Sequence, residues 1–209
     1  ADPTYTGRVS VPVLWDAAAE TVVNEESDEI MRTLAANFAG YRGVDLYPEG
    51  MRDEIDRVIE ELYDRINRGV YHAGFAETQA EYEMAAERVF DALDRRESVL
   101  ADRRYLLGDR LTLADLQLFA TLVRFDAVYH THFKVNRRRL VDYPNLWGFT
   151  RDIYQTESVA DTVNLDHVRE HYYRSHTDLN PTGFVPIGPD VDFDAPHDRD
   201  ELPGEPPEA

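Results

Sequence analysis

VPVLWD at residues 11–16 and VVNEES at residues 22–27 decide the fold, because they predict two short strands that lead into a helix. The valines and the tryptophan in these runs favour strands. A two-stranded ribbon with one helix buries too little apolar surface to be stable alone in water. We therefore expect this part of the chain to belong to a larger α/β domain that starts upstream or is completed by another segment.

Beyond these strands the apolar residues recur at helical spacing over most of the chain. The spacing predicts helices at residues 27–38, 51–68, 77–101, 112–131, 146–155 and 165–175, with Gly69 ending the second. The predicted fold class is α+β, with a β-β-α unit at 1–39, a linker at 40–48, an all-helical bundle at 49–176 and an extended tail at 177–209. The tail is rich in Pro, Gly and Asp, and we expect it to wrap around the bundle.

The charge is strongly acidic, with 41 Asp and Glu against 22 Lys and Arg, a net charge of −19. Self-repulsion of this size destabilises a compact protein unless salt screens it. Because the acids are spread along the chain, we interpret them as an adaptation to high salt and not as a docking surface. Clustered cations would be needed to bind nucleic acid, and only Arg137, Arg138 and Arg139 form a run, so nucleic acid is not an expected partner.

Several classes of protein are excluded by what the 209 residues lack. They contain no cysteine, which excludes disulfides, thiolate-bound zinc, iron-sulfur clusters and a thiol nucleophile among these residues. No apolar run approaches the ~18 residues of a membrane span, and no secretory signal is evident. We expect a cytoplasmic protein without a membrane partner.

LTLADL at residues 111–116 contains a helix-capping box, in which Thr112 and Asp115 satisfy each other's backbone amides. Such a box is common and has a purely structural meaning by itself. Its place in the middle of a bundle that follows a β-β-α unit resembles the helical domain of glutathione transferases.

Longer strings narrow this resemblance. They are VPVLWD, NEES, GVYHAGFA, YLLGDRLTLADLQLFATLVRFDAVYHTHFKVN, YPNLWGFTRDIYQ, HYYRSH and NPTGFVPIGP. Together they resemble the glutathionyl-hydroquinone reductases, the Xi class of the glutathione transferases, over nearly the whole chain to about residue 190. The resemblance implies that residues 1–39 are the second half of a thioredoxin-like domain, that an enlarged helical domain follows, and that the protein is a homodimer.

The activity that the resemblance implies is thiol exchange. A cysteine thiolate attacks the sulfur of a glutathionyl-hydroquinone, the hydroquinone leaves, and a second thiol resolves the mixed disulfide. Because these residues include no cysteine, we expect the nucleophile to lie upstream, on a missing first half or on a companion N-terminal fragment. The thiol co-substrate would be glutathione or, in a salt-adapted host, γ-glutamylcysteine.

The resemblance also assigns a cradle for the thiol peptide. Pro12 corresponds to the cis-proline of thioredoxin-like folds, which would turn the backbone of Val11 toward the cysteinyl part of the peptide. Glu26 and Ser27 match the pair that holds the γ-glutamyl end, since a helix N-terminus receives a carboxylate and Glu26 receives an ammonium. The structural alternatives are a surface proline in trans, a plain N-cap at Ser27 and a solvated Glu26.

A flat hydroquinone with two hydroxyls needs ring contacts and hydrogen bonds, which tyrosines supply. Tyr71 in GVYHAGFA and Tyr172 with Tyr173 in HYYRSH are the candidates for this pocket, and one of them could protonate the leaving oxygen. The alternative is that they fill the core. Tyr172 and Tyr173 point about 100° apart on a helix, so we expect only one of them to reach the pocket.

Lys134 is the single lysine of a chain that otherwise uses arginine, which suggests a site where a compact ammonium contacts a substrate oxygen or a buried carboxylate; chance survival is the alternative. Trp15 follows a strand, and we expect it to pack against a helix. Five histidines raise the alternative of a metal site: His130, His132, His167, His171 and His176. His167 and His171 lie four apart on one helix face and can share a zinc ion, but there is no H-E-x-x-H pattern and no evident third ligand, so no metal is predicted. We expect these rings to hydrogen-bond backbone groups or one another near the rim of the active site.

Three classes of function are consistent with these residues. The leading one is the glutathione-dependent reduction of glutathionyl-hydroquinones. The second is a glutathione transferase that activates the thiol through a hydroxyl and conjugates electrophiles. The third is a non-catalytic, thiol-binding or scaffold protein. The residue at the start of the first thioredoxin-domain helix would separate them, because a cysteine there supports the first class and a serine or tyrosine the second.

Overall fold

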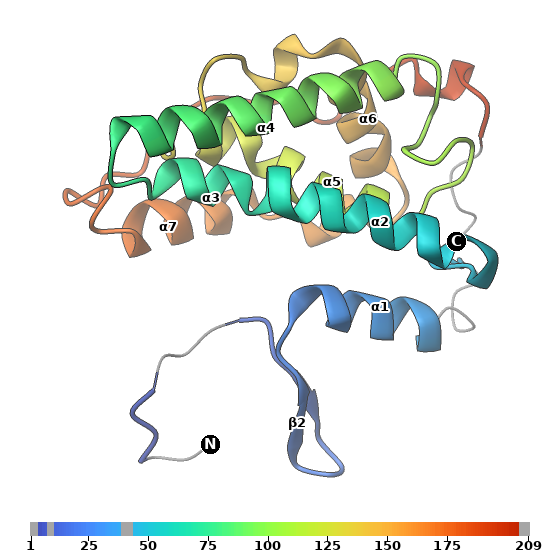
Figure 1. The fold of residues 1–209 in the computed structure, drawn as a ribbon, viewed down its shortest axis with the longest axis horizontal. Helices are drawn as coiled ribbons and strands as arrows, with labels where there is room; N and C mark the ends of the chain where they lie inside the picture. The colour runs from blue at the N-terminus through green and yellow to red at the C-terminus, as the bar shows by residue number, and fades with distance from the viewer. Residues whose placement is uncertain (1–3, 8–10, 39–43, 205–209) are drawn as a thin grey trace.

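A computed structural model describes residues 4–7, 11–38 and 44–204 of the protein (Figure 1). Its strands are β1 (Leu14–Asp16) and β2 (Thr21–Asn24), and its α-helices are α1 (Ser27–Phe38), α2 (Arg52–Leu62), α3 (Gly69–Gly74), α4 (Gln79–Val99), α5 (Leu113–Arg124), α6 (Pro144–Gln155) and α7 (Leu165–Ser175). Two π-helical segments, η3 (Tyr63–Asn67) and η4 (Phe125–Tyr129), and the 3-10 turns η2 (Glu49–Met51), η5 (Leu140–Asp142), η6 (Ala160–Thr162) and η7 (Arg199–Glu201) complete the described elements. The predicted α+β class, a small sheet followed by a helical bundle, is confirmed.

The two strands form an antiparallel hairpin that projects from the start of α1 (Figure 1). The Asp16 carboxylate closes the turn by accepting hydrogen bonds from the backbone amides of Ala18 at 2.8 Å and Ala19 at 2.9 Å. Trp15 is 54% exposed, so the prediction that it packs against a helix is wrong within the described part of the chain. A two-stranded hairpin offers its side chains no second layer, which leaves Val22 and Val23 exposed as well.

Helix α1 lies beside α2 in Figure 1, is joined to it by an ion pair, and contacts α5. Ile30 is its buried residue. The Arg32 guanidinium is 2.9 Å from Asp28 on its own helix and 2.9 Å from Asp56 on α2. The Tyr47 hydroxyl donates to the same Asp56 carboxylate at 2.7 Å. Asp56 therefore binds both helix α1, through Arg32, and the segment before α2, through Tyr47.

The apolar repeat predicted for residues 51–68 forms the buried face of α2 and η3, where Ile55, Ile59, Leu62 and Ile66 are almost fully inaccessible. Gly69 does not end this helical stretch, contrary to the prediction, because α3 begins at that residue after the π-helical turn. A Cβ at Gly69 would lie 2.8 Å from a methyl group of Val89 on α4. The glycine is therefore there to let two helices approach closely, and not to break one.

The predicted capping box is present at the start of α5 and is fully buried. One carboxylate oxygen of Asp115 accepts from both the backbone amide and the hydroxyl of Thr112, each at 2.8 Å. The other oxygen accepts from the amide of Leu106 at 2.8 Å, so the box also fixes the loop before the helix. Burial raises the pKa of Asp115 to about 6, against the effect of these three hydrogen bonds.

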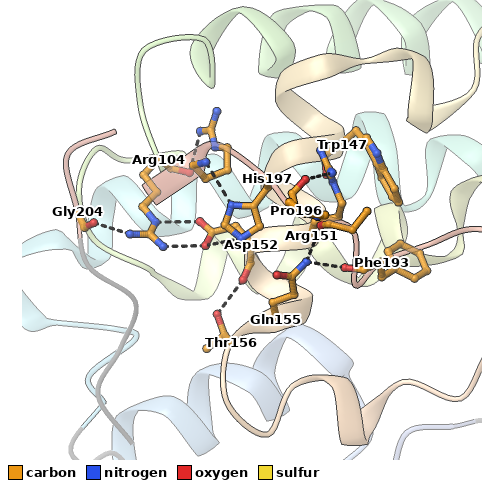
Figure 2. Close-up of polar contacts among 12 residues, drawn as sticks. Arg104, Trp147, Arg151, Asp152, Gln155, Thr156, Phe193, Pro196, His197 and Gly204 are labelled. Atoms are coloured by element: carbon orange, nitrogen blue, oxygen red, sulfur yellow. Dashed lines mark hydrogen bonds and ion pairs between the residues drawn. The ribbon is translucent and has the colours of Figure 1, made fainter. Parts of the chain in front are cut away.

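Residues 177–204, which we call the C-terminal strap, run back along the bundle and end beside the loop after α4 (Figure 1). The Arg199 side chain, 2% exposed, donates to the carbonyls of Leu100 at 2.6 Å and Arg104 at 3.0 Å. Figure 2 shows the pair of Arg104 and Asp152 underneath the strap, joined at 2.8 and 2.9 Å, with Arg104 also bound to the Gly204 carbonyl at 2.6 Å.

The middle of the strap is held by side chains of α6. Gln155 donates to the carbonyls of Phe193 at 2.8 Å and Ala195 at 2.9 Å (Figure 2). The Phe193 ring packs on those of Trp147 and Tyr154, with centroids 5.4 and 5.0 Å away. The strap thus has no long helix among its described residues, yet it is bound to the bundle along its length.

Candidate functional site

Three tyrosines from different helical elements bring their hydroxyls together, and we call them the tyrosine cluster. Tyr71 lies on α3, Tyr129 ends η4, and Tyr172 lies on α7. The Tyr172 hydroxyl is 2.5 Å from that of Tyr71 and 3.0 Å from that of Tyr129. Tyr172 is therefore the central member, hydrogen-bonded to residues that are 101 and 43 positions away in the sequence.

Phe133 packs its ring against the rings of all three tyrosines. Its centroid is 5.1 Å from that of Tyr71, 5.5 Å from Tyr129 and 6.0 Å from Tyr172. Phe133 comes this close to α3 because residue 74 is glycine, where a Cβ would lie 2.4 Å from the Phe133 ring. The glycine of GVYHAGFA thus has a direct role in the geometry of the tyrosine cluster.

The surroundings of Tyr71 and Tyr129 keep their hydroxyls protonated. Burial raises the pKa of Tyr71 above its ordinary value, and the adjacent Tyr172 raises it further. Burial also raises the pKa of Tyr129 well above its ordinary value. Arg124 lowers the pKa of both tyrosines, but its effect is smaller than that of burial. At neutral pH Tyr71 and Tyr129 are therefore proton donors and not sources of tyrosinate.

Tyr71 is the member that reaches solvent, with 36% of its surface exposed. It lines a cavity of about 540 Å³ between η3, α3 and the first half of α4. The ring of Phe75 and the side chain of His72 line the same cavity, together with the carboxylates of Glu77 and Glu81. The volume is in the range of small-molecule sites, and its wall combines apolar rings with a few polar groups.

The other two candidates from the second half of the chain lie differently. The Tyr173 hydroxyl donates to the Ala127 carbonyl at 3.3 Å, so only Tyr172 of the adjacent pair joins the tyrosine cluster. Lys134 is exposed, with a positive φ of 59°, and lines a second cavity of about 440 Å³ with Tyr82. Its carbonyl accepts from the Tyr82 hydroxyl at 2.6 Å, and no described carboxylate forms an ion pair with its ammonium.

The four residues assigned to the thiol-peptide cradle lie on the hairpin and at the start of α1. The Val11–Pro12 peptide bond is cis, as the resemblance implied, and the Val11 side chain is 86% exposed. Ser27 is the first residue of α1 and is exposed, as is Glu26. The Glu26 amide donates to the Asn24 side chain at 2.9 Å, which fixes the turn into the helix and leaves the Glu26 carboxylate on the surface.

Tyr129 was not predicted as part of a site, and neither was Phe133. Both belong to the string YHTHFK, and their separation of four residues places them on one side of a helical turn. That spacing was the available signal. The expectation that histidines bond one another near the site is met by His132 and His176, whose Nε2 and Nδ1 atoms are 3.2 Å apart.

No group of three His, Cys, Asp or Glu side chains in the described ranges is arranged to hold a metal ion. Among the same residues, no helix is both long enough and apolar enough to cross a membrane.

The chain is similar to several known proteins. Residues 79–152 match the family model for the C-terminal domain of glutathione S-transferases. A glutathionyl-hydroquinone reductase of Escherichia coli is 52% identical over 202 residues, which are 96% of this chain and 62% of that protein. A solved structure of the same bacterial protein with glutathione bound superposes with a TM-score of 0.90, at 51% identity over 96% of this chain and 66% of that one.

Two solved Xi-class structures are similar over nearly the same extent. The Xi-class transferase of Natrialba magadii is 54% identical, with a TM-score of 0.92, over 95% of this chain and 62% of that one. Glutathione transferase Xi 1 of Trametes versicolor is 45% identical, with a TM-score of 0.84, over 90% of this chain and 67% of that one. The chain belongs to the glutathione transferase family, in its Xi class. It spans about three fifths of the length of the curated relatives it matches.

Proposed function

We propose that these residues form part of a glutathione-dependent reductase that converts glutathionyl-hydroquinones to hydroquinones. They would supply the acceptor pocket and part of the thiol-peptide cradle. The cysteine nucleophile would lie in a part of the protein outside these 209 residues, which contain none. The proposal is supported by the curated relatives named as reductases of this kind and by the bacterial relative solved with glutathione.

The observation that carries the proposal is the meeting of the Tyr71, Tyr172 and Tyr129 hydroxyls, together with the place of Tyr71 in the wall of a cavity. A hydroquinone presents a flat ring and two oxygens, and a phenol offers both a ring contact and a hydrogen bond. Because Tyr71 stays protonated and partly exposed, it can donate a proton to a substrate oxygen while Tyr172 donates to Tyr71 in turn.

The proposed reaction uses that proton when the hydroquinone leaves. The cysteine thiolate forms a bond to the glutathionyl sulfur, and the carbon–sulfur bond of the substrate's keto tautomer breaks with its electron pair moving into the ring. The ring oxygen then accepts the proton of Tyr71, and the product leaves as a hydroquinone. A second glutathione thiolate attacks the mixed disulfide, which restores the cysteine and gives oxidised glutathione. Solvent returns a proton to Tyr71.

A transferase that activates glutathione through a tyrosinate is less well supported. Such an enzyme needs a phenol whose pKa is lowered, so that it accepts the thiol proton. Tyr71 and Tyr129 both have raised pKa values, caused first by burial. Proton donation to a leaving group fits these residues better than deprotonation of a thiol, although a hydroxyl outside these residues could still serve the second role.

We assign the thiol-peptide cradle to Val11, Pro12, Glu26 and Ser27, supported by the cis peptide bond and by the exposure of all four residues. We keep Lys134 as a substrate-binding candidate, because its exposed ammonium lines a cavity beside α3 without a carboxylate partner among the described residues. Tyr173 is retained only as a positioning candidate, since its hydroxyl bonds the backbone of Ala127.

We further propose a cytoplasmic homodimer that works at high salt, with domain boundaries near residues 39, 48 and 176. The acidic charge and the 54% identity to the protein of Natrialba magadii support the adaptation to salt. The co-substrate would be glutathione or γ-glutamylcysteine, and mass spectrometry of the purified protein would reveal a companion N-terminal fragment if one carries the cysteine.

The test replaces Tyr71 by phenylalanine in the whole protein that carries the cysteine. Tyr71→Phe should lower kcat for hydroquinone release about 100-fold, the scale of lost general-acid catalysis, with the fold unchanged by circular dichroism. Tyr63→Phe, a tyrosine of η3 outside the cluster, is the control and should retain the parental rate. An unaltered rate in Tyr71→Phe would remove this residue from the mechanism, and a protein that turns over no glutathionyl-hydroquinone would refute the proposed substrate.

A further inference from the structure

His132, which is buried, and His176, which is partly buried, form an imidazole pair next to the tyrosine cluster. Their Nε2 and Nδ1 atoms are 3.2 Å apart, and their rings are stacked at 11° with centroids 5.4 Å apart. His132 is 7% exposed. A neutral imidazole has one N–H donor and one nitrogen acceptor, so this contact is a single directional N–H···N hydrogen bond.

The His132 end of the pair is fixed to the turn that presents Tyr129. The His132 amide donates to the Val128 carbonyl at 2.7 Å, which holds the residue against η4. Its ring lies 4.5 Å from that of Tyr173 and 5.3 Å from that of Phe133. The His132 ring therefore has little freedom to move relative to Tyr129 and Phe133.

The His176 end is fixed to the helix that carries Tyr172. His176 is the C-cap of α7, one turn after Tyr172, and its amide donates to the Tyr172 carbonyl at 3.4 Å. The same carbonyl also acts on the His132 imidazole and favours its protonated form. The His176 ring stands edge-on to Phe75 at 5.1 Å and to Tyr172 at 5.5 Å. The pair thus joins the last turn of α7 to the turn after η4.

We propose that His132 and His176 are positioning residues that hold the Tyr172 hydroxyl between those of Tyr71 and Tyr129. Tyr172 makes both hydrogen bonds of the cluster, at 2.5 and 3.0 Å, and a shift of α7 by a fraction of an ångström would lengthen one or both. The catalytic consequence rests on the proposed reductase function. The positioning itself does not.

The charged and titratable groups around the pair suit a neutral hydrogen bond. Burial is the largest influence that opposes protonation of both imidazoles. Lys134 also opposes protonation of His132, and His171 opposes protonation of His176. Burial and the neighbouring His176 and Lys134 lower the pKa of His132 to about 4. The pair therefore keeps one donor and one acceptor at neutral pH, which is the state that the geometry requires.

The test uses three variants of histidines on α7. His176→Phe keeps a ring against Phe75 and Phe133 but removes the hydrogen bond. His176→Asn restores a polar atom near the position of Nδ1 and should rescue the effect. His167→Phe is the matched control, because His167 lies on the same helix, is exposed, and faces a different cavity from Tyr71.

The first readout is independent of activity. In protein labelled with ¹³C at the tyrosine ζ carbon, the signals of Tyr71 and Tyr172, assigned with phenylalanine variants, report the hydroxyl bonds directly. His176→Phe should shift both signals and lower the pH at which Tyr71 ionises, because Tyr172 now raises its pKa less. His176→Asn and His167→Phe should leave both signals close to the parental positions.

The second readout is turnover of a glutathionyl-hydroquinone by the whole protein. His176→Phe should lower kcat about tenfold with little change in the KM for glutathione, as expected when a proton donor is misplaced and the thiol site is intact. Unchanged tyrosine signals in folded His176→Phe would overturn the positioning role. Shifted signals in a protein that has no reductase activity would leave the positioning role standing and refute the proposed function. If His176→Phe does not fold, His132→Phe provides the same comparison, with His132→Gln as the variant that can still hydrogen-bond, and parental signals in folded His132→Phe would then overturn the positioning role.

Discussion

The tyrosine cluster and the charges beneath the C-terminal strap are both polar groups held inside the protein, but their hydrogen bonds are completed differently. Under the strap, the guanidinium of Arg104 meets both oxygens of Asp152 and the Gly204 carbonyl (Figure 2). Arg199 donates to the backbone carbonyls of Leu100, Arg103 and Arg104, and only its buried Nε has no partner among the described residues. In the cluster, the hydroxyls have mostly one another as partners, and Tyr71 faces a cavity.

This difference separates structure from function. Buried polar groups whose donors and acceptors are satisfied within the protein lock one arrangement in place and have little capacity left for a ligand. Tyr71 lines a cavity and is partly exposed, and its hydroxyl has only other phenols as hydrogen-bond neighbours in the described part of the chain, so it retains capacity to donate to a bound molecule. The strap end of the bundle is therefore expected to govern stability, and the cluster end to govern activity.

Breaking the charge pair beneath the strap should have the largest effect on stability. Asp152→Ala leaves the Arg104 guanidinium, 5% exposed, without its carboxylate, and should lower the free energy of unfolding by about 4 kcal/mol. Urea unfolding at high salt measures this loss. Asp64→Ala is the control, because its ion pair with Arg88 is solvent-exposed on both sides and should contribute little. A small loss in Asp152→Ala would contradict the structural role of the pair.

The pH dependence of stability should come from the cluster end. The pKa of His132 is lowered to about 4 in the folded protein, below the 6.5 of an unperturbed histidine, so the unfolded chain binds a proton first as the pH falls. The contribution of His132 to stability should therefore decrease between about pH 6.5 and 4, by up to about 3 kcal/mol.

His132→Gln isolates that contribution, because glutamine can still hydrogen-bond but does not titrate. Unfolding free energies of the parent and this variant, measured at fixed high salt between pH 7 and 4, should approach each other as the pH falls. Parallel curves would show that the folded protein accepts the proton on His132 without penalty. Asp115 works in the opposite direction, since its raised pKa of about 6 makes the folded state bind a proton first between about pH 6 and 4. That effect is common to both proteins and cancels in the comparison.

The same contrast explains what the sequence could and could not predict. The apolar spacing of Ile55, Ile59 and Leu62 predicts their buried helix face, and the box of Thr112 and Asp115 predicts the start of α5, because both signals are local. The strap and the cluster depend on partners far apart in the chain, such as Arg104 with Asp152 and Tyr71 with Tyr172. No local pattern encodes those pairs.

Resemblance supplied part of what local patterns could not. It pointed to the cis bond at Pro12 and to Tyr71 and Tyr172, which the structure brings together. It did not point to Tyr129, although this residue belongs to the string YHTHFK, which is part of the resemblance. The continuation of the helix past Gly69 was missed for a physical reason: glycine is a helix breaker only where no neighbouring helix needs its space.

A smaller effect should link stability and activity at Gly74. A Cβ there would lie 2.4 Å from the Phe133 ring, which must move and take its contacts with Tyr71 with it. Gly74→Ala should cost about 2 kcal/mol of stability by overpacking and should reduce turnover more than stability alone explains. Gly50→Ala, where a Cβ would meet no atom within 4 Å, is the control and should change neither. Parental turnover in Gly74→Ala would show that Phe133 does not position the cluster.

The smallest expected effect concerns the cap of α4, which stands beside the cavity of Tyr71. Thr78 caps this helix by accepting from the Glu81 amide at 3.2 Å, and Glu81 accepts from the Thr78 amide at 3.1 Å. Thr78→Ala should lower the free energy of unfolding by about 1 kcal/mol, and Thr78→Ser should restore most of it. Glu81 also lines the cavity, so its freed carboxylate can approach the substrate oxygens and repel them. Thr78→Ala should therefore also raise the KM for the hydroquinone conjugate slightly while kcat is unchanged. A fall in kcat instead would mean that the cap acts on the tyrosine cluster itself, and the division between a stability end and an activity end would then have to be redrawn to include the start of α4.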